Sequence, residues 1–111
     1  MTDDQWFKMT PEAAQAYGRP IPDGFLVRAG STAMINGSPK IKRDRQLREQ
    51  LVADGILVRG QDPDLYQFAV DHEFKSASAA GGIIKDGNCS GPMAWKRVKD
   101  GLSLREVQSE G

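Results

Sequence analysis

The sequence contains a single cysteine, Cys89, and a single histidine, His72. One cysteine cannot form a disulfide framework within the chain, so we expect a reducing compartment and predict a cytoplasmic location. A zinc site needs several histidine or cysteine ligands at short spacings, and the sequence has no cysteine pair and no second histidine. We therefore expect no bound metal and no cofactor.

Long apolar runs are also missing. No stretch approaches the roughly 20 apolar residues that cross a bilayer. The opening residues, MTDDQWFK, are acidic where a secretory signal is basic and then apolar. We expect no association with a membrane.

The chain has no net charge, because 15 Lys and Arg residues balance 15 Asp and Glu residues. A neutral molecule exerts no overall attraction on nucleic acid or on a membrane surface. Any binding of nucleic acid must therefore come from a local basic patch.

Recognisable catalytic motifs are lacking as well. The sequence has no G-x-S-x-G elbow, no phosphate-binding Walker loop and no dinucleotide fingerprint between a strand and a helix. Asp71, His72 and Glu73 are adjacent, but successive side chains of a strand point to opposite faces and cannot all reach one ion. No spacing links Cys89 to His72 as a nucleophile and its base. We predict that the protein is not an enzyme.

The composition is that of a folded domain, with 111 residues of which 39% are hydrophobic and 27% charged. We predict an α+β fold, in which a small, mainly antiparallel sheet of four or five strands is packed by two or three helices. Residues 1–23 are expected to form a helical extension and linker, because Thr10-Pro11-Glu12 resembles a helix start and Gly18 a stop. Residues 24–111 are then the single α+β accessory domain.

The element boundaries follow from turn and capping signals. Helices are expected over residues 38–54 and 76–84, and a short one begins at Ser103, which forms a capping box with Glu106. Strands are expected over residues 25–27, 33–35, 56–58, 66–70 and 93–98. Gly30 either separates the first two strands or forms a bulge within one.

The helix over residues 38–54 carries the densest group of cations in its first half. They are Lys40, Lys42, Arg43, Arg45 and Arg48. This group is a candidate contact for nucleic acid, and the alternative is a solvated helix face supported by pairs such as Arg45 and Glu49.

Two further groups are candidates for the same role. Lys96 and Arg97 lie beside Trp95, whose ring is a possible stacking surface for a base. Ser76 and Ser78 open a helix, where hydroxyls and free N–H groups can hold a phosphate. The alternative for both serines is plain helix capping.

Four segments together resemble a known family. They are LREQLVADGIL (47–57), YQFAVDHEFKSASAAGG (66–82), SGPMAWK (90–96) and DGLSL (100–104). The chain resembles the domain of unknown function found C-terminal to GIY-YIG nucleases and in restriction-modification proteins, which is related to RAMA-type domains. The resemblance covers residues 24–107. It departs from the family pattern at Ala77, at Gly81 and in the loop around Asn88 to Ser90.

The resemblance implies a function. It implies a non-catalytic accessory domain that handles DNA or RNA and works with a nuclease or modification protein in trans. The alternative is a protein-interaction or dimerisation module that binds no nucleic acid. The sequence leaves the oligomeric state open.

Overall fold

The computed structural model describes residues 5–36 and 45–109. The larger of its two sheets has five antiparallel strands in the order β7-β3-β2-β1-β8. These strands are β1 (Phe7–Met9), β2 (Ala16–Ile21), β3 (Gly24–Val27), β7 (His72–Phe74) and β8 (Lys96–Arg97).

The smaller sheet has three antiparallel strands in the order β4-β6-β5. These strands are β4 (Thr32–Met34), β5 (Leu57–Arg59) and β6 (Leu65–Phe68), and the helices are α1 (Arg45–Ala53), α2 (Ala77–Lys85), α3 (Gly91–Ala94) and α4 (Leu104–Ser109). The predicted α+β class is confirmed, with one more sheet and one more helix than we expected.

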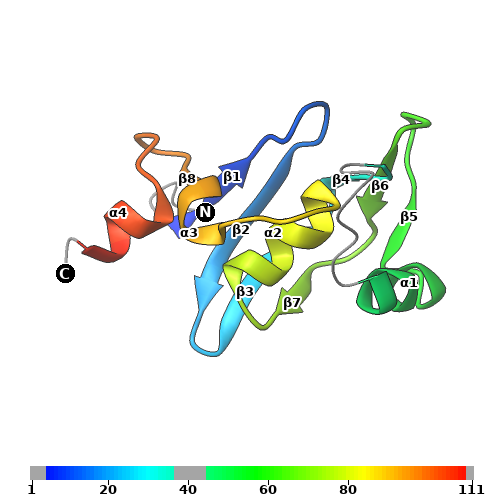
Figure 1. Ribbon diagram of the computed structural model, residues 1–111, viewed down its shortest axis with the longest axis horizontal. Helices are drawn as coiled ribbons and strands as arrows, with labels where there is room; N and C mark the ends of the chain where they lie inside the picture. The colour runs from blue at the N-terminus through cyan, green and yellow to red at the C-terminus, as the bar shows by residue number, and fades with distance from the viewer. Residues whose placement is uncertain (1–4, 37–44, 110–111) are drawn as a thin grey trace.

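Helix α2 is the central helix of the fold. It contacts β3 and β7 of the larger sheet and β4 of the smaller one, so it packs across both. In Figure 1 the smaller sheet and α1 lie at one end of the molecule, and α4 lies at the other. As predicted, Ser76 caps α2, and its Oγ accepts a hydrogen bond from the Ala79 N–H at 3.0 Å. A helix rich in Ala and Gly is weak on its own, and burial of residues 80–84 supplies the stabilisation it needs.

The core surrounds α2 and includes side chains of both sheets, and Trp95 is its largest fully buried side chain. The Trp95 ring packs against Phe25 with 4.6 Å between ring centroids. Its Nε1–H donates to the Ala77 carbonyl oxygen at 3.1 Å, which satisfies the one polar atom that burial would otherwise strand.

The strand that we predicted over residues 93–98 is wrong. The segment forms the short helix α3 up to Ala94, and then the two-residue strand β8. Pro92 lies in the first turn of α3, where the missing N–H costs nothing. A Cβ built on Gly91 would lie 2.4 Å from the Ser78 backbone nitrogen, so the glycine allows α3 to approach α2 closely.

The helical extension that we predicted over residues 1–23 is also wrong in its described part. Thr10-Pro11-Glu12 belongs to a turn, in which the Ala14 N–H donates to the Pro11 carbonyl oxygen at 3.0 Å. The flanking residues form β1 and β2, which lie inside the larger sheet between β3 and β8. Pairing with β3 and β8 and burial of Phe7 and Met9 outweigh the local capping signal.

Gly30 marks the point where the chain passes between the sheets. β3 and β4 belong to different sheets, so the alternative of two strands is the correct one. Gly30 has a φ of 89°, and its N–H donates to the Phe68 carbonyl oxygen at 2.9 Å. Among the described residues, no helix has the length and apolar character that a membrane span requires.

Candidate nucleic-acid interface

The predicted cationic helix is only partly described. Lys40, Lys42 and Arg43 lie outside the described residues, and Arg45 is exposed at the start of α1. Arg48 is different, because it is 6% exposed and donates hydrogen bonds to the carbonyl oxygens of Met34 and Ile83.

Arg48 also lies 3.8 Å from the buried carboxylate of Asp86, measured from Nε to Oδ1. Burial lowers the pKa of the Arg48 guanidinium, and Asp86 acts against that shift by favouring the charged form. The residue joins α1 to β4 and to the C-terminal end of α2. Our prediction that Arg48 forms part of a cationic surface is therefore wrong.

Ser76 and Ser78 both make hydrogen bonds within the fold. Ser76 caps α2, and the Ser78 Oγ accepts a hydrogen bond from the Gly91 N–H at 2.9 Å, which ties α3 to α2. The capping alternative accounts for Ser76, and the contact between helices accounts for Ser78. A phosphate contact at this position stays a prediction.

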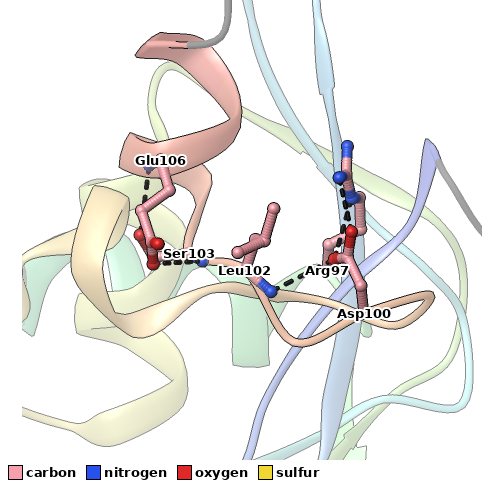
Figure 2. A network of polar contacts seen from close by, with 5 residues as sticks. All are labelled: Arg97, Asp100, Leu102, Ser103 and Glu106. Atoms are coloured by element: carbon pink, nitrogen blue, oxygen red, sulfur yellow. Dashed lines mark hydrogen bonds and ion pairs between the residues drawn. The ribbon is translucent and has the colours of Figure 1, made fainter.

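Trp95, Lys96 and Arg97 lie in three different environments. Trp95 is 0% exposed, so it offers no ring face to a base and the predicted stacking surface is wrong. Arg97 forms a two-point ion pair with Asp100, with 3.0 Å from Nε to Oδ1 and 2.6 Å from a terminal nitrogen to Oδ2 (Figure 2). That hydrogen bond is the main cause that lowers the pKa of Asp100 to about 2. Only Lys96 of this group is both exposed and outside such a pair in the described part of the chain.

Side-chain hydrogen bonds fix both ends of the turn that follows β8, and the sequence indicated the residues that make them. Figure 2 shows the Leu102 N–H donating to Asp100, and Ser103 and Glu106 exchanging hydrogen bonds at 3.1 Å in both directions. The predicted capping box is confirmed. The N–H and hydroxyl groups of Ser103 lower the pKa of Glu106, because both stabilise the carboxylate.

The larger sheet has one buried face and one open face. Phe7, Gly18 and Val27 are cross-strand neighbours on the buried face, which α2 covers. Because strand side chains alternate, the residues between them point the other way. Lys8 is therefore level with both Tyr17 and Lys96 on the open face, and Arg19 is level with Leu26.

Two backbone hydrogen bonds extend these rows. The Arg28 N–H donates to the Tyr17 carbonyl oxygen at 2.8 Å, and the Val98 N–H donates to the Trp6 carbonyl oxygen at 3.0 Å. Trp6 and Arg28 thus continue the same side of the sheet. We call this surface the outer face, and its residues are Trp6, Lys8, Tyr17, Arg19, Arg28 and Lys96.

Cations and aromatic rings alternate on the outer face. The Arg28 Cζ lies 5.5 Å from the centroid of the Trp6 ring and 4.9 Å from that of Tyr17. The Arg19 Cζ lies 5.6 Å from the Trp6 centroid. These distances lie within the cation–π range of about 6 Å, so each guanidinium lies over the face of an aromatic ring. The acids of this side, Asp71 and Glu73, lie at the β7 edge, away from Lys8 and Lys96.

A family model described as Domain of unknown function (DUF4357) matches residues 7–108. The chain belongs to this family. No curated protein matches the chain, and no solved structure matches it. The DUF4357 match extends beyond residues 24–107, on which we based the resemblance, and includes β1 and β2.

The outer face of this DUF4357 domain was missed in the sequence because it depends on two strands within the segment that we predicted to be a helical extension and linker. The signal was present in the order Trp6-Phe7-Lys8-Met9, where apolar and polar side chains alternate after the tryptophan. Phe7 and Met9 are buried and Lys8 is exposed, as a strand with one covered face requires.

The side chains of Asp71, His72 and Glu73 do not converge on one point in the DUF4357 fold. The Asp71 carboxylate accepts the Ala29 N–H at 2.8 Å, and the His72 ring lies 4.8 Å from the Phe74 ring on the covered side of β7. Glu73 points to the opposite face and is exposed. Burial lowers the pKa of His72 and raises the pKa of the Cys89 thiol. Within residues 5–36 and 45–109, no group of three or more His, Cys, Asp or Glu residues is placed to hold a metal ion.

Proposed function

We propose that this DUF4357 domain is a non-catalytic accessory domain that binds nucleic acid through the outer face of its larger sheet. The observation that supports the proposal is the alternation of Trp6 and Tyr17 with cations on one side of three adjacent strands. Unpaired bases stack on aromatic side chains and guanidinium planes, while neighbouring cations neutralise the phosphates. The ligand that we propose for this face is a single strand of DNA or RNA.

The uneven distribution of charge favours the same function. The molecule has zero formal net charge, yet Lys8, Arg19, Arg28 and Lys96 share one side of the sheet. A local patch of this kind attracts a polyanion at low ionic strength even though the whole molecule does not.

The accessory role rests on the resemblance to domains that accompany GIY-YIG nucleases and restriction-modification proteins. We propose that a nuclease or modification protein acts in trans with this domain, which then contributes binding and no chemistry. We also propose a cytoplasmic location, which the single cysteine favours.

A binding titration tests the proposal. Short single- and double-stranded DNA and RNA are titrated at several salt concentrations, and we expect the single strands to bind best. For single strands the logarithm of the binding constant falls with the logarithm of salt by about 0.7 per phosphate contacted, so the substitution Arg19→Gln should reduce the slope by about that amount. Exposed Arg59 of β5 lies in the other sheet, and the control Arg59→Gln should leave the slope unchanged.

Stacking is tested through Trp6 and Tyr17. Replacing either ring with leucine should weaken binding by about 1–3 kcal/mol per stacked base. Because Trp95 is fully buried, a bound base should quench the fluorescence of Trp6 and leave that of Trp95 unchanged, as a Trp6→Phe variant would show.

No binding of any strand at low salt would reject the proposal. The alternative of a protein-interaction or dimerisation module would then be favoured. Its contact would not be the small-residue helix, since residues 80–84 of α2 are buried in the core. The partly exposed Leu47, Val52 and Val58 on α1 and β5 are the apolar side chains to test, by measuring mass against concentration.

A further inference from the structure

Three lysines from three elements surround one hollow at the end of the larger sheet. Lys8 comes from β1, Lys96 from β8 and Lys85 from the last turn of α2. The hollow has a volume of about 330 Å³, at the lower end of the range for small-ligand pockets. Met9 and Ala94 contribute apolar surface, Thr10 contributes a hydroxyl, and no acidic residue lines it.

Without a ligand, the placement of Lys8 beside Lys96 is unfavourable for the stability of the fold. They are direct cross-strand partners, and like charges at such positions destabilise a sheet. The pairing of β1 with β8 has only two such residue pairs, so this repulsion falls on the shortest strand of the sheet. Neither lysine lies within ion-pair distance of a described acidic residue, although the charge of Lys96 helps to lower the pKa of Glu106.

Lys85 has a structural role of its own, because a cation in the last turn of a helix interacts favourably with the helix dipole. That role does not explain why Lys85 faces the same hollow as the other two lysines. Three lysines therefore line one space whose other lining residues are uncharged, and such a lining suits a compact anion of high charge.

We infer that the hollow binds a phosphomonoester, with the phosphate between Lys8, Lys85 and Lys96 and the attached apolar or aromatic group against Met9 and Ala94. A phosphomonoester carries a charge of about −1.5 to −2 at neutral pH, and three ammonium groups match it better than they match a singly charged phosphodiester. Two sources present this group, the terminal phosphate of a nucleic-acid strand and a free nucleotide. The inference goes beyond binding on the outer face, although Lys8 and Lys96 belong to both sites.

Calorimetric titration of the full chain with adenosine 5′-monophosphate tests the hollow. We expect the monophosphate to bind at least tenfold more tightly than adenosine and than its monoanionic methyl ester. The variant Lys85→Gln removes a hollow residue that is not on the outer face, and we expect it to weaken binding about tenfold, which is about 1.4 kcal/mol. The matched control is Lys75→Gln, an exposed lysine before α2 that does not line the hollow. Equal binding of the three ligands, or equal behaviour of the two variants, would overturn the inference.

Oligonucleotides of one sequence, with and without a 5′-phosphate, distinguish the sources and separate this inference from the proposed function. A gain from the 5′-phosphate that Lys85→Gln abolishes identifies the strand end. Monophosphate binding that depends on Lys85, without binding of any oligonucleotide, upholds the hollow for a free nucleotide and rejects the outer face. A third result is that the oligonucleotides bind, the terminal phosphate has no effect and the monophosphate does not bind. That result would reject the phosphate site in the hollow and would leave the proposal for the outer face unaffected.

Discussion

Arg48 and Trp95 show how residue type alone misleads. Arginine and tryptophan are the residues expected at a nucleic-acid surface, yet Arg48 and Trp95 are both buried, at 6% and 0% exposure. Each has its polar atoms satisfied inside the fold, Arg48 by two carbonyl oxygens and Asp86, and Trp95 by the Ala77 carbonyl oxygen. The sequence shows which side chains are available for a surface, but the partners that bury them are distant in the chain.

Replacing Arg48 with alanine should be strongly destabilising. The change takes the Arg48 guanidinium away from the buried Asp86 carboxylate and leaves two buried carbonyl oxygens without these donors. We expect a loss of about 3–5 kcal/mol in the free energy of unfolding, measured by urea denaturation. Arg45→Ala, at the exposed start of the same helix, should change it by no more than about 0.5 kcal/mol.

A double variant checks the cause. Adding Asp86→Asn to Arg48→Ala removes the buried charge that Arg48 compensates, so part of the lost stability should return. Asparagine also tolerates the left-handed backbone of position 86, where φ is 57°. A double variant that is less stable than Arg48→Ala would show that the charge of Asp86 is not the source of the loss.

At the scale of elements, the sequence predicted those whose ends are fixed locally. Ser76 before α2 and the Ser103–Glu106 box before α4 are hydrogen bonds within a few residues, so the signal lies in the sequence itself. β1 and β2 were missed because Thr10-Pro11-Glu12, in the turn between them, resembles a helix start. The other partner of β1 is also distant in the chain, since Phe7 is level with Arg97 of β8. The outer face consists of side chains on these strands, so it was not predicted either.

The turn from β8 to α4 should show its ion pair in a titration of Asp100. The folded pKa of about 2 lies below the ordinary value of 3.8, so the stabilisation is present at neutral pH and is lost as the pH falls from about 4 towards 2. Carboxyl-carbon NMR shifts should give a midpoint near 2 in the unmodified chain. Arg97→Gln should return the midpoint of Asp100 towards about 4, while Lys99→Gln, next to the carboxylate in the chain, should move it far less. An unchanged midpoint in Arg97→Gln would exclude the ion pair as the cause.

The contact between α3 and α2 should be sensitive to a single methyl group. A Cβ at position 91 would lie 2.4 Å from the Ala77 carbonyl carbon and from the Ser78 nitrogen, and both are backbone atoms that cannot turn aside. We expect Gly91→Ala to cost about 1–3 kcal/mol in thermal or urea unfolding. Ser90→Ala is the control, because the exposed Ser90 side chain makes no capping hydrogen bond, and it should cost no more than about 0.5 kcal/mol.

At the scale of the whole molecule, β1 and β2 belong to the middle of the larger sheet, and a chain that begins at residue 24 lacks both strands. Removing residues 1–23 would leave β3 paired with β7 alone and β8 without β1, and would uncover Phe25 and Trp95 in the core. We expect this truncated chain to lose cooperative thermal unfolding, measured by circular dichroism, while the full chain retains it. A cooperative transition in the truncated chain would support our initial division of the sequence at residue 24.

The order of strands also determines when the domain can fold during its synthesis. β1, β2 and β3 are consecutive and form one antiparallel meander, but Trp95, which covers its inner face, is translated much later. At about 5–20 residues per second, roughly 3 to 14 s separate the appearance of Val27 from that of Trp95. During most of that interval neither α2 nor Trp95 has been translated to cover the apolar sheet face, so we expect ribosome-bound intermediates to be chaperone clients until α3 has emerged.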